Sequence, residues 1–240
     1  MFFFKKKYRL LDTGVFLNKT DIHSHLLPGV DDGSPNMVTT SELLDFMENT
    51  IGFRSIWFTP HVMEELMKNT PEILTEKFNE VREVYKGNMI LNLASEYMLD
   101  SSFIKRLPRD ILRLGKKHIL IETSYMAPPN DMKSIIENII DNGYIPLLAH
   151  PERYRYMNKN SYQYWIDSGC KLQLNFMSLS GYYGEGPKLA SEYLLSERKY
   201  DNVGSDLHHL KYYKDMLLRL YMTSEQIDVF EELLYNNENL

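Results

Sequence analysis

Residues 20–34 read TDIHSHLLPGVDDGS and place two histidines, His23 and His25, at the end of a short apolar run. Side chains alternate between the faces of a β-strand, so these imidazoles would point the same way. Two imidazoles on one face can hold a divalent metal ion. Two aspartates, Asp31 and Asp32, follow in a loop rich in proline and glycine. The alternative is a polar strand end that happens to contain two histidines, so the rest of the chain has to decide.

The composition is that of a globular protein. The chain has 240 residues, of which 43% are hydrophobic and 25% are charged, so it can bury a sizeable core. No repeat or long linker divides it, which predicts one domain over residues 1–240 with residues 1–19 as an N-terminal extension. The net charge of −6 argues against broad nucleic-acid binding, which needs a basic surface.

The chain has one cysteine, Cys170, so no intramolecular disulfide can form and a reducing cytoplasm is the expected location. The same count excludes a cysteine-rich zinc site. It also excludes a Cys-x5-Arg phosphatase motif, because Phe176 stands where that motif needs arginine. Any hydrolysis therefore has to proceed without a thiolate nucleophile.

The N-terminus reads MFFFKKKYRL, and it lacks the order of a secretory signal, in which positive charges precede a longer apolar segment. No window approaches the roughly 18 apolar residues of a transmembrane helix. A frayed or locally packed terminus is the favoured interpretation, with at most weak contact between this segment and a membrane surface.

Apolar runs alternate with longer segments of helical pattern, which predicts repeated βα units. We expect seven strands, near residues 20–24, 55–60, 89–96, 118–123, 145–150, 171–176 and 201–206. Thr70 and Pro71 predict a helix start that continues to about residue 86. A second helix is expected from Asn130 or Asp131 to residue 142, with Ile135, Ile136, Ile139 and Ile140 on its apolar side. Two more are expected near residues 212–220 and 224–235.

Such a pattern fits a closed barrel or an open doubly wound sheet, and the polar residues favour the barrel. In βα barrels, functional groups collect at the carboxyl ends of several strands. Six of the seven predicted strands end at or just before His, Asp or Glu. The residues are His23, His25, His61, Glu96, Glu122, His150, Asp206 and His208, with Asp31 and Asp32 in the first loop.

Nitrogen and carboxylate ligands without thiolate suit zinc, manganese or iron. About nine candidate ligands exceed what one ion of four to six ligands can use, so two or three metal ions are implied. Individual residues keep other interpretations. Glu96 could be a buried ion-pair partner, and the two aspartates could simply shape the turn at Gly33.

Three further groups are interpreted structurally. His118 begins a predicted strand and is taken as structural. His209 should point away from His208, beside the ligands or at the surface. The tyrosines around Arg153 are taken as surface packing, with a role toward substrate as the alternative. They are Tyr154, Tyr156, Tyr162 and Tyr164.

The motifs DIHSHLLPGVDDGS, TPH, SEY, ETS, AHPERY and SDLHH, in this order, resemble the polymerase and histidinol phosphatase (PHP) superfamily. They are similar in particular to its bacterial metal-dependent protein tyrosine phosphatases of the CpsB/YwqE type. The resemblance covers residues 20–210. It implies a distorted, TIM-barrel-like seven-stranded (β/α)7 barrel that binds two to three divalent metals. Manganese is the expected metal, with iron, zinc or magnesium as alternatives.

The resemblance also implies roles for individual residues. His23, His25, Glu122 and Asp206 would hold one metal, and Glu122 would bridge to a second metal shared with His150. Asp32, His61, Glu96 and His208 would surround a third. Arg153, Glu122 and His150 are the expected catalytic residues, Arg153 by holding the substrate phosphate.

One departure from the resembled group lies after Asp206. Its members usually carry a second arginine a few residues on, whereas this chain reads HLKYYK at residues 209–214. Lys211 or Lys214 could replace it as a point charge.

The predicted activity is hydrolysis of phosphotyrosine by a metal-activated hydroxide, without a covalent enzyme intermediate. The resemblance implies that the substrate is the tail of a bacterial tyrosine kinase that controls capsular or exopolysaccharide synthesis. The alternatives are a small-molecule phosphatase of the histidinol-phosphate type, a metal-dependent nuclease, and a non-catalytic metal-binding protein. The sequence does not indicate an oligomeric state.

Overall fold

The computed structural model describes residues 5–64, 66, 67 and 69–240, in which short strands alternate with helices. The strands are β1 (Lys7–Arg9), β2 (Thr20–Asp21), β3 (Ser55–Phe58), β4 (His61–Val62), β5 (Ile90–Leu93), β6 (Glu96–Met98), β7 (His118–Glu122), β8 (Ile145–Ala149), β9 (Lys171–Asn175), β10 (Asn202–Gly204) and β11 (Tyr221–Thr223). The α-helices are α1 (Met37–Asp45), α2 (Pro71–Val84), α3 (Phe103–Arg106), α4 (Met132–Asp141), α5 (Lys159–Asp167), α6 (Glu185–Ser196), α7 (Leu210–Leu217) and α8 (Ser224–Asn237). The remaining helical segments are η1 (Leu10–Thr13), η2 (Phe46–Ile51), η3 (Pro151–Arg153) and η4 (Phe176–Ser180).

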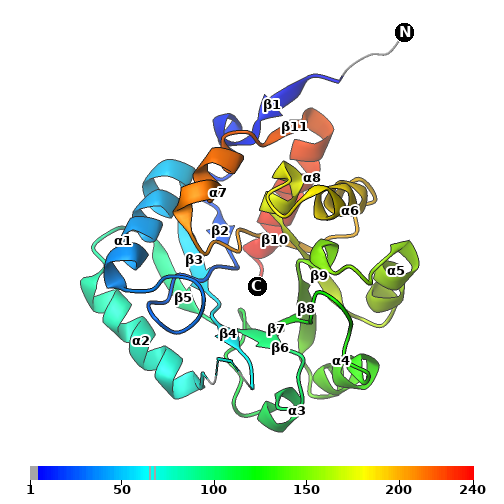
Figure 1. Ribbon diagram of the computed structural model, residues 1–240. Coiled ribbons are helices and arrows are strands. Elements are labelled where there is room, and N and C mark those ends of the chain that lie inside the picture. The colour runs from blue at the N-terminus through cyan, green and yellow to red at the C-terminus, as the bar shows by residue number, and fades with distance from the viewer. Residues whose placement is uncertain (1–4, 65, 68) are drawn as a thin grey trace.

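The central strands form two parallel sheets, with the helices around them (Figure 1). One sheet has the order β2-β3-β5 and the other has the order β10-β9-β8-β7-β6-β4. This confirms the predicted α/β class with parallel strands. The described residues do not form the closed seven-stranded barrel that the sequence predicted, because the ladder is interrupted in two places.

The first interruption arises because two predicted strands each break in the middle. Of residues 55–60, only Ser55–Phe58 form β3, and β4 begins at the next residue, His61; residues 89–96 divide into β5 and the first residue of β6. β3 pairs with β5, whereas β4 pairs with β6 in the other sheet. The break after β3 falls at Thr59-Pro60, where proline has no N–H to donate to a ladder. The chain therefore passes from one sheet to the other just before His61 and Glu96.

The second interruption lies between β2 and β10, where side chains replace most of the ladder. Ser24 and Leu207 form an isolated parallel bridge, and the Asp206 amide donates to the His23 carbonyl at 2.8 Å. Asn237, at the end of α8, lies in this seam. Its side-chain amide donates to the carbonyls of Thr20 and Val203 and accepts from the Val203 amide.

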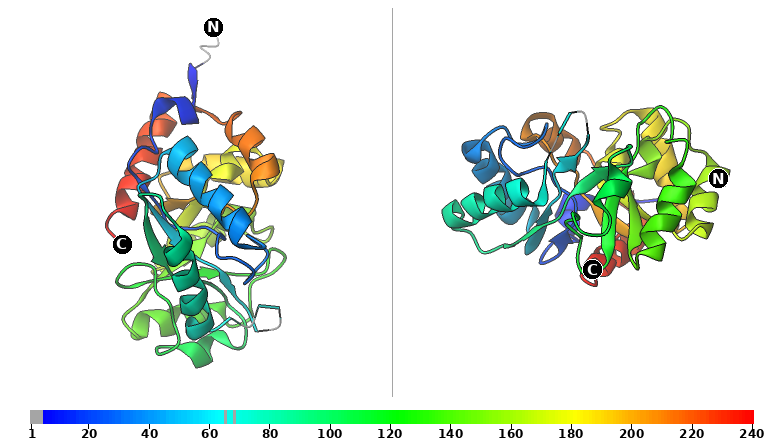
Figure 2. Two further views of the ribbon diagram at one scale, coloured as in Figure 1. Left: turned by 90° about the vertical axis from the view of Figure 1, so that its left-hand side faces the viewer. Right: turned by 90° about the horizontal axis from the view of Figure 1, so that it is seen from below.

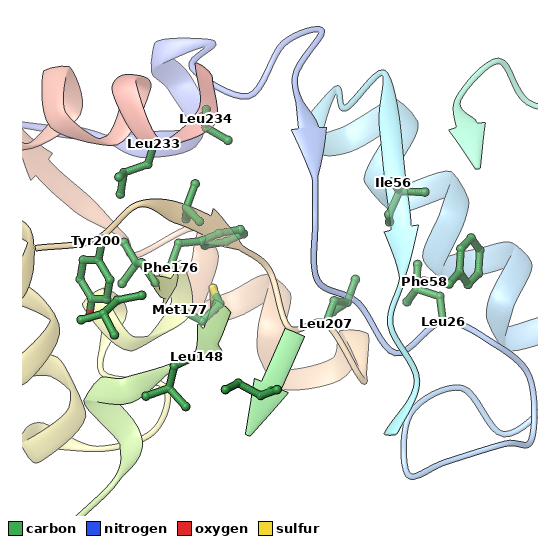
Figure 3. Packing of buried hydrophobic residues seen from close by; sticks show 14 of the residues in the cluster. Leu26, Ile56, Phe58, Leu148, Phe176, Met177, Tyr200, Leu207, Leu233 and Leu234 are labelled. Atoms are coloured by element: carbon green, nitrogen blue, oxygen red, sulfur yellow. The ribbon is translucent and has the colours of Figure 1, made fainter. Parts of the chain in front are cut away.

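Strands β7 and β8 are buried on both faces, which explains their nearly continuous apolar sequences. Along β7 and β8, Ile119, Ile121 and Leu148 join the large core, whereas Leu120 and Leu147 join a smaller cluster on the opposite face. Figure 3 shows part of the large core, in which Leu233 and Leu234 of α8 lie on one side and Leu26, Ile56 and Phe58 lie on the other.

The predicted helices near residues 71, 131, 212 and 224 are present as α2, α4, α7 and α8. Thr70 caps α2 by accepting a hydrogen bond from the Ile73 amide, as its sequence predicts. Three of the four isoleucines expected inside α4 are buried, but Ile140 is 39% exposed. A four-residue stripe is wider than the face that α4 buries, so its last member faces solvent.

The N-terminal segment is packed against the C-terminal part of the chain. β1 pairs antiparallel with β11, and both lie at one end of the molecule beside α8 (Figure 2). Leu10 and Phe16 are buried in the core. The three phenylalanines considered for membrane contact, at residues 2–4, lie outside the described residues. Among the helices that are described, none combines the length and the apolarity needed to cross a membrane.

Candidate metal centre

The nine predicted ligands converge at one end of the two sheets. Eight of them come from positions at or within a few residues of the ends of β2, β4, β6, β7, β8 and β10, and Asp32 comes from the loop between β2 and α1. Three overlapping groups have ligand atoms that all lie within 4.8 Å of one another. They are His25, Asp32, His61 and His208; His23, His25, Glu96 and Asp206; and His61, Glu96 and Glu122.

Glu96 lies at the centre of this cluster. Its Oε2 is 3.2 Å from the Nε2 atoms of His23 and His25 and 3.2 Å from His61 Nδ1. Its Oε1 is 3.0 Å from His150 Nε2. The Glu96 side chain is 0% exposed, so it meets these four imidazoles in an interior where their interaction is strong.

This arrangement differs from the partition that the resemblance implied. Glu96, rather than Glu122, groups with His23, His25 and Asp206, while Glu122 groups with His61 and Glu96. The reason lies in the broken third strand, which makes Glu96 the first residue of β6 instead of the last residue of a longer strand. In the β6–β7 register Glu96 pairs with Leu120, whereas Glu122 pairs with Met98. Glu122 thus lies two residues farther along than Glu96.

The two aspartates of the first loop have different environments. Asp31 is fully engaged: its Oδ2 lies 2.8 Å from His25 Nδ1 and accepts from the His61 amide, and its Oδ1 accepts from the Gly33 amide. Asp32 instead points into the cluster, with its Oδ1 at 3.6 Å from His61 Nε2 and 3.4 Å from His208 Nε2. Its side chain is 61% exposed. The geometry therefore leaves the Asp32 carboxylate available to bind a metal ion, whereas Asp31 orients the His25 ring.

Three imidazole rings are each oriented by an oxygen atom that contacts Nδ1, the ring nitrogen facing away from the cluster. Nδ1 of His23 lies 2.9 Å from Gln173 Oε1, and Nδ1 of His208 lies 2.9 Å from the Asp206 carbonyl. Asp31 does the same for His25. Each contact leaves Nε2 directed into the cluster, as in metal sites where an outer oxygen fixes the tautomer of a histidine ligand.

Several buried atoms in the cluster lack a hydrogen bond, which fits a metal ligand set. His61 Nδ1 and Glu122 Oε1 are 2.8 Å apart, yet neither has a hydrogen-bond partner of suitable geometry among the described residues. Buried polar atoms are seldom left without partners. The donor set of imidazole nitrogens and carboxylate oxygens is one that divalent transition metals accept.

The charges of the cluster shift the pKa values of its members. Burial by itself lowers the pKa of His61, and so does His25, but the carboxylates of Glu122 and Glu96 raise it to about 9. Burial likewise opposes ionisation of Asp206, yet His23, His208 and Arg153 hold its pKa well below the usual range. Positive charge is therefore strongly favoured around these carboxylates.

The backbone at two candidate ligands is in the left-handed region. His150 has a φ of 36° and Asp206 has a φ of 49°, which L-residues rarely adopt. The His150 amide donates to the Gln173 carbonyl at 2.9 Å, and the Asp206 amide donates to the His23 carbonyl, so both conformations are held by neighbouring strands. Unusual backbone held in this way is common at functional sites.

Two glycines allow the chain to pass close to the ligands. A Cβ on Gly33 would lie 2.0 Å from the His25 carbonyl oxygen, and a Cβ on Gly204 would lie 2.5 Å from His23 Cβ. No side chain fits at either position without displacing a histidine. This gives the glycine of the DDG motif a steric role beside the turn that the sequence predicted.

Arg153 lies at the edge of the cluster, next to Asp206. Its Nη1 donates to Asp206 Oδ2 at 2.5 Å. Its guanidinium is also 4.7 Å from the ring centroid of Tyr125 and 4.0 Å from that of Tyr183. Tyr183 in turn donates a hydrogen bond to Asp206 Oδ2 at 3.3 Å. Arg153 is thus held on several sides next to a candidate ligand, Asp206.

The two lysines considered as replacements for a second arginine are both exposed on α7. The Lys214 ammonium lies 4.9 Å from the centroid of the Phe46 ring. Of the remaining histidines, His118 begins β7 at the opposite end of the strand from Glu122, and His209 is exposed. Neither belongs to the three ligand groups.

A cavity of about 600 Å³ adjoins Arg153. It lies between the β7–α4 loop, the segment after η3, and the start of α6, and Tyr125, Tyr154, Tyr162 and Tyr183 line it. Tyr154 and Tyr162 are only 2% and 4% exposed, which corrects their interpretation as surface packing; Tyr164 is 46% exposed and fits it.

Sequence reasoning missed three residues of the site: Gln173, Tyr125 and Tyr183. Gln173 carries a usable signal, because it is a polar residue within the apolar run KLQLN. The two tyrosines carry no comparable signal in the sequence. Their contacts with Arg153 depend on loops whose path only the folded chain shows.

Comparison with known proteins places this site in a family. The family model described as "Capsular polysaccharide synthesis, CpsB/CapC" matches residues 19–237. The chain belongs to the CpsB/CapC family. This confirms the family that the motifs predicted, and the match spans every candidate ligand.

Relatives in the CpsB/CapC family carry names that describe an activity. "Tyrosine-protein phosphatase YwqE" of Bacillus subtilis is 29% identical over 219 residues, 88% of this chain and 84% of the relative. "Tyrosine-protein phosphatase CpsB" of Streptococcus pneumoniae is 29% identical over 202 residues, 79% of this chain and 83% of the relative. A similar solved structure comes from work on YwqE and CpsB, titled as "unique metal-dependent tyrosine phosphatases". It has a TM-score of 0.75, 27% identity and 90% coverage of both chains.

Proposed function

We propose that this protein is a metal-dependent protein tyrosine phosphatase. Membership of the CpsB/CapC family and the activity in the names of its relatives support this. The observation that carries it is structural. Buried imidazoles and carboxylates converge at one place, and oxygen atoms outside the cluster orient three of the imidazole rings. Arg153 lies next to this cluster and is fixed there by its bond to Asp206.

The ligand set would hold two to three divalent ions, with manganese as the expected metal. His23, His25, Glu96 and Asp206 form one group, His25, Asp32, His61 and His208 a second, and His61, Glu96 and Glu122 a third. His150, which contacts Glu96, extends the third group. Divalent metals in such sites supply Lewis-acid neutralisation of phosphoryl charge and a water-derived nucleophile at neutral pH.

The residues of the chain itself would position the substrate. Arg153 offers guanidinium N–H groups to phosphoryl oxygens, and its bond to Asp206 and its contacts with two tyrosine rings limit its movement. A held guanidinium loses little entropy when it binds a phosphate, which favours catalysis by positioning. Phenolate is a good enough leaving group, with a parent pKa near 10, that the reaction does not demand a strong general acid.

Several finer points belong to the same proposal. The two sheets would act as one distorted seven-stranded barrel in a single domain, with residues 1–19 as its extension. The substrate would be a phosphotyrosine protein, a bacterial tyrosine kinase of capsule synthesis being the expected partner. The single buried cysteine supports a reducing, cytoplasmic location.

The experiment that tests the proposal compares three substrates with one protein preparation in manganese. We expect phosphate release from a phosphotyrosine peptide at a much higher kcat/KM than from histidinol phosphate, and no cleavage of single-stranded DNA. Asp206→Asn keeps the size and the backbone preference of Asp206 and should lose at least about 100-fold in rate. A preference for histidinol phosphate would indicate a small-molecule phosphatase instead. Metal binding without hydrolysis of any substrate would indicate a non-catalytic metal-binding protein.

A further inference from the structure

The cavity beside Arg153 is a second compartment next to the metal centre. None of the nine candidate ligands is among the described residues that line it. The two compartments share Arg153 and its flanking tyrosines as a common wall. At about 600 Å³ the cavity is within the size range of pockets that bind small molecules or side chains.

The walls of the cavity have a definite chemistry. Tyr154, Tyr162, Met157 and Pro187 provide apolar and aromatic surface, to which an aromatic ring binds well. Arg153 and Arg155 add positive charge, and Arg155 is exposed and makes no ion pair with any described carboxylate.

Glu152 is the one acidic residue among the described residues that line the cavity, and its carboxylate points away from the cavity. Its carboxylate accepts hydrogen bonds from the Asn175 amide, Ser178 Oγ and Tyr200 OH in the interior. The cavity therefore suits an apolar group that comes with negative charge, in a protein whose net charge is −6.

The position of the cavity distinguishes two occupants. The ligands that face solvent are Asp32, with 61% of its side chain exposed, and His208, with 23%. A phosphoryl group that reached the cluster over these two residues would leave its own phenyl ring on that exposed side, outside the cavity. The cavity lies on the other side of Arg153, where the next residue of a bound peptide would reach it.

We propose that this cavity binds an aromatic side chain next to the phosphotyrosine of the substrate protein. The assignment rests on the proposed phosphatase function and adds a determinant of sequence preference to it. Arg155, at the exposed side of the cavity, would favour an acidic residue close to that aromatic side chain.

Gly186 offers a way to fill the cavity without straining the fold. It lines the cavity in the first turn of α6, and a Cβ placed on it meets no atom within 4 Å. Gly186→Trp therefore introduces a large ring into open space. Leu189→Trp is the matched control, because Leu189 lies on the same helix, is 56% exposed and does not line the cavity.

The experiment measures kcat/KM for p-nitrophenyl phosphate and for phosphotyrosine peptides with alanine or phenylalanine on either side. We expect the parent and Leu189→Trp to prefer a phenylalanine peptide by about tenfold or more, and Gly186→Trp to lose this preference. Ala190→Leu, a smaller filling of the same cavity, should reduce it in part.

Other outcomes separate failure of this inference from failure of the phosphatase proposal. If the parent hydrolyses all peptides equally, the phosphatase function holds and the assignment of the cavity is wrong. If Gly186→Trp slows p-nitrophenyl phosphate and every peptide by the same factor, the cavity holds the phosphotyrosyl ring itself, which also overturns the assignment. If the parent releases phosphate from none of these substrates, the phosphatase proposal fails.

Discussion

Gly204 shows how a single small residue can determine the position of a candidate metal ligand. It ends β10, directly beside His23, which follows β2, and an added methyl group would lie 2.5 Å from His23 Cβ and 2.8 Å from Gln173 Nε2. Gln173 is the residue that orients the His23 ring. One substitution at Gly204 would thus disturb both the ligand and its support.

We expect Gly204→Ala to lower phosphatase activity by about 100-fold, because displacing a site residue by about 1 Å has effects of this size. Manganese affinity, measured by isothermal titration calorimetry, should fall in parallel. The melting temperature reports separately on folding. Full activity with unchanged manganese binding would show that His23 does not need its observed position.

Cys170 is a second residue with a testable property. It is 1% exposed, and burial raises the pKa of its thiol to about 12. A thiol reacts as the thiolate, so a raised pKa and lack of access both slow its reaction.

We expect alkylation of Cys170 by iodoacetamide at pH 8 to be at least about 100-fold slower in the native protein than in the unfolded chain. Phosphatase activity should not change during that incubation. Rapid native alkylation, detected by mass spectrometry, would contradict the burial of this side chain.

At the scale of elements, the seam between β2 and β10 is where the fold departs most from prediction. Asn237 uses both its donor hydrogens and its acceptor oxygen there, on Thr20, Val203 and Asn202. It is 2% exposed, so the groups that it satisfies have no access to water. The C-terminal helix therefore takes the place of ladder hydrogen bonds.

Asn237→Ala should lower the free energy of unfolding by about 3 kcal/mol, because it leaves several buried backbone groups without partners. Asn236→Ala is the control. The neighbouring side chain donates one hydrogen bond, to the Asp201 carbonyl, and is exposed, so its loss should cost about 0.5–1 kcal/mol. Equal effects in urea denaturation would show that the seam is not held as described.

Glu48 connects η2 to the segment before β5. Its carboxylate accepts hydrogen bonds from Tyr85 OH at 2.6 Å and from the Asn88 amide at 2.7 Å. Burial alone would raise the pKa of this carboxyl, but these donors outweigh burial and lower it from 4.5. A carboxyl with a lowered folded-state pKa contributes stability above its unfolded pKa and loses it as the pH falls through the folded value.

Glu48→Gln should therefore be destabilising at pH 7, by about 1 kcal/mol, and much less so at pH 3. Urea denaturation of both proteins at the two pH values measures this. If the parent and Glu48→Gln differed more in free energy of unfolding at pH 3 than at pH 7, the proposed role of Glu48 would be wrong.

The elements also show what the sequence could predict. The parallel α/β class, the cap at Thr70 and the position of ligands at strand ends follow from local patterns. The two broken strands do not, because their halves are too short for a periodic signal and they exchange sheets through tertiary pairing. That exchange is what moves Glu96 to the centre of the cluster, so the assignment of each ligand to a group could not be read from spacing.

At the scale of the whole molecule, the site gathers residues from segments nearly 190 positions apart, from His23 to His208. Its buried carboxylates include Glu96, Glu122 and Asp206, which favour bound positive charge. A ligand that binds only the folded chain stabilises it, by about 2.7 kcal/mol at 100 times its dissociation constant.

Removal of metal by chelation should therefore lower the melting temperature, by about 5–10 °C for a chain of this size. Added manganese should restore it in the parent protein and not in His23→Ala. Scanning calorimetry measures both. A melting temperature that is indifferent to manganese would indicate that the cluster does not bind this metal.

The central claim is that the converging histidines and carboxylates form the metal centre of a tyrosine phosphatase. The most direct measurement is phosphate release from a phosphotyrosine peptide during titration of chelator-treated protein with manganese, alongside His23→Ala. We predict that activity appears in the parent as two to three equivalents of manganese bind and stays absent in His23→Ala. Activity without metal, or manganese binding at the same stoichiometry without any hydrolysis, would contradict the claim.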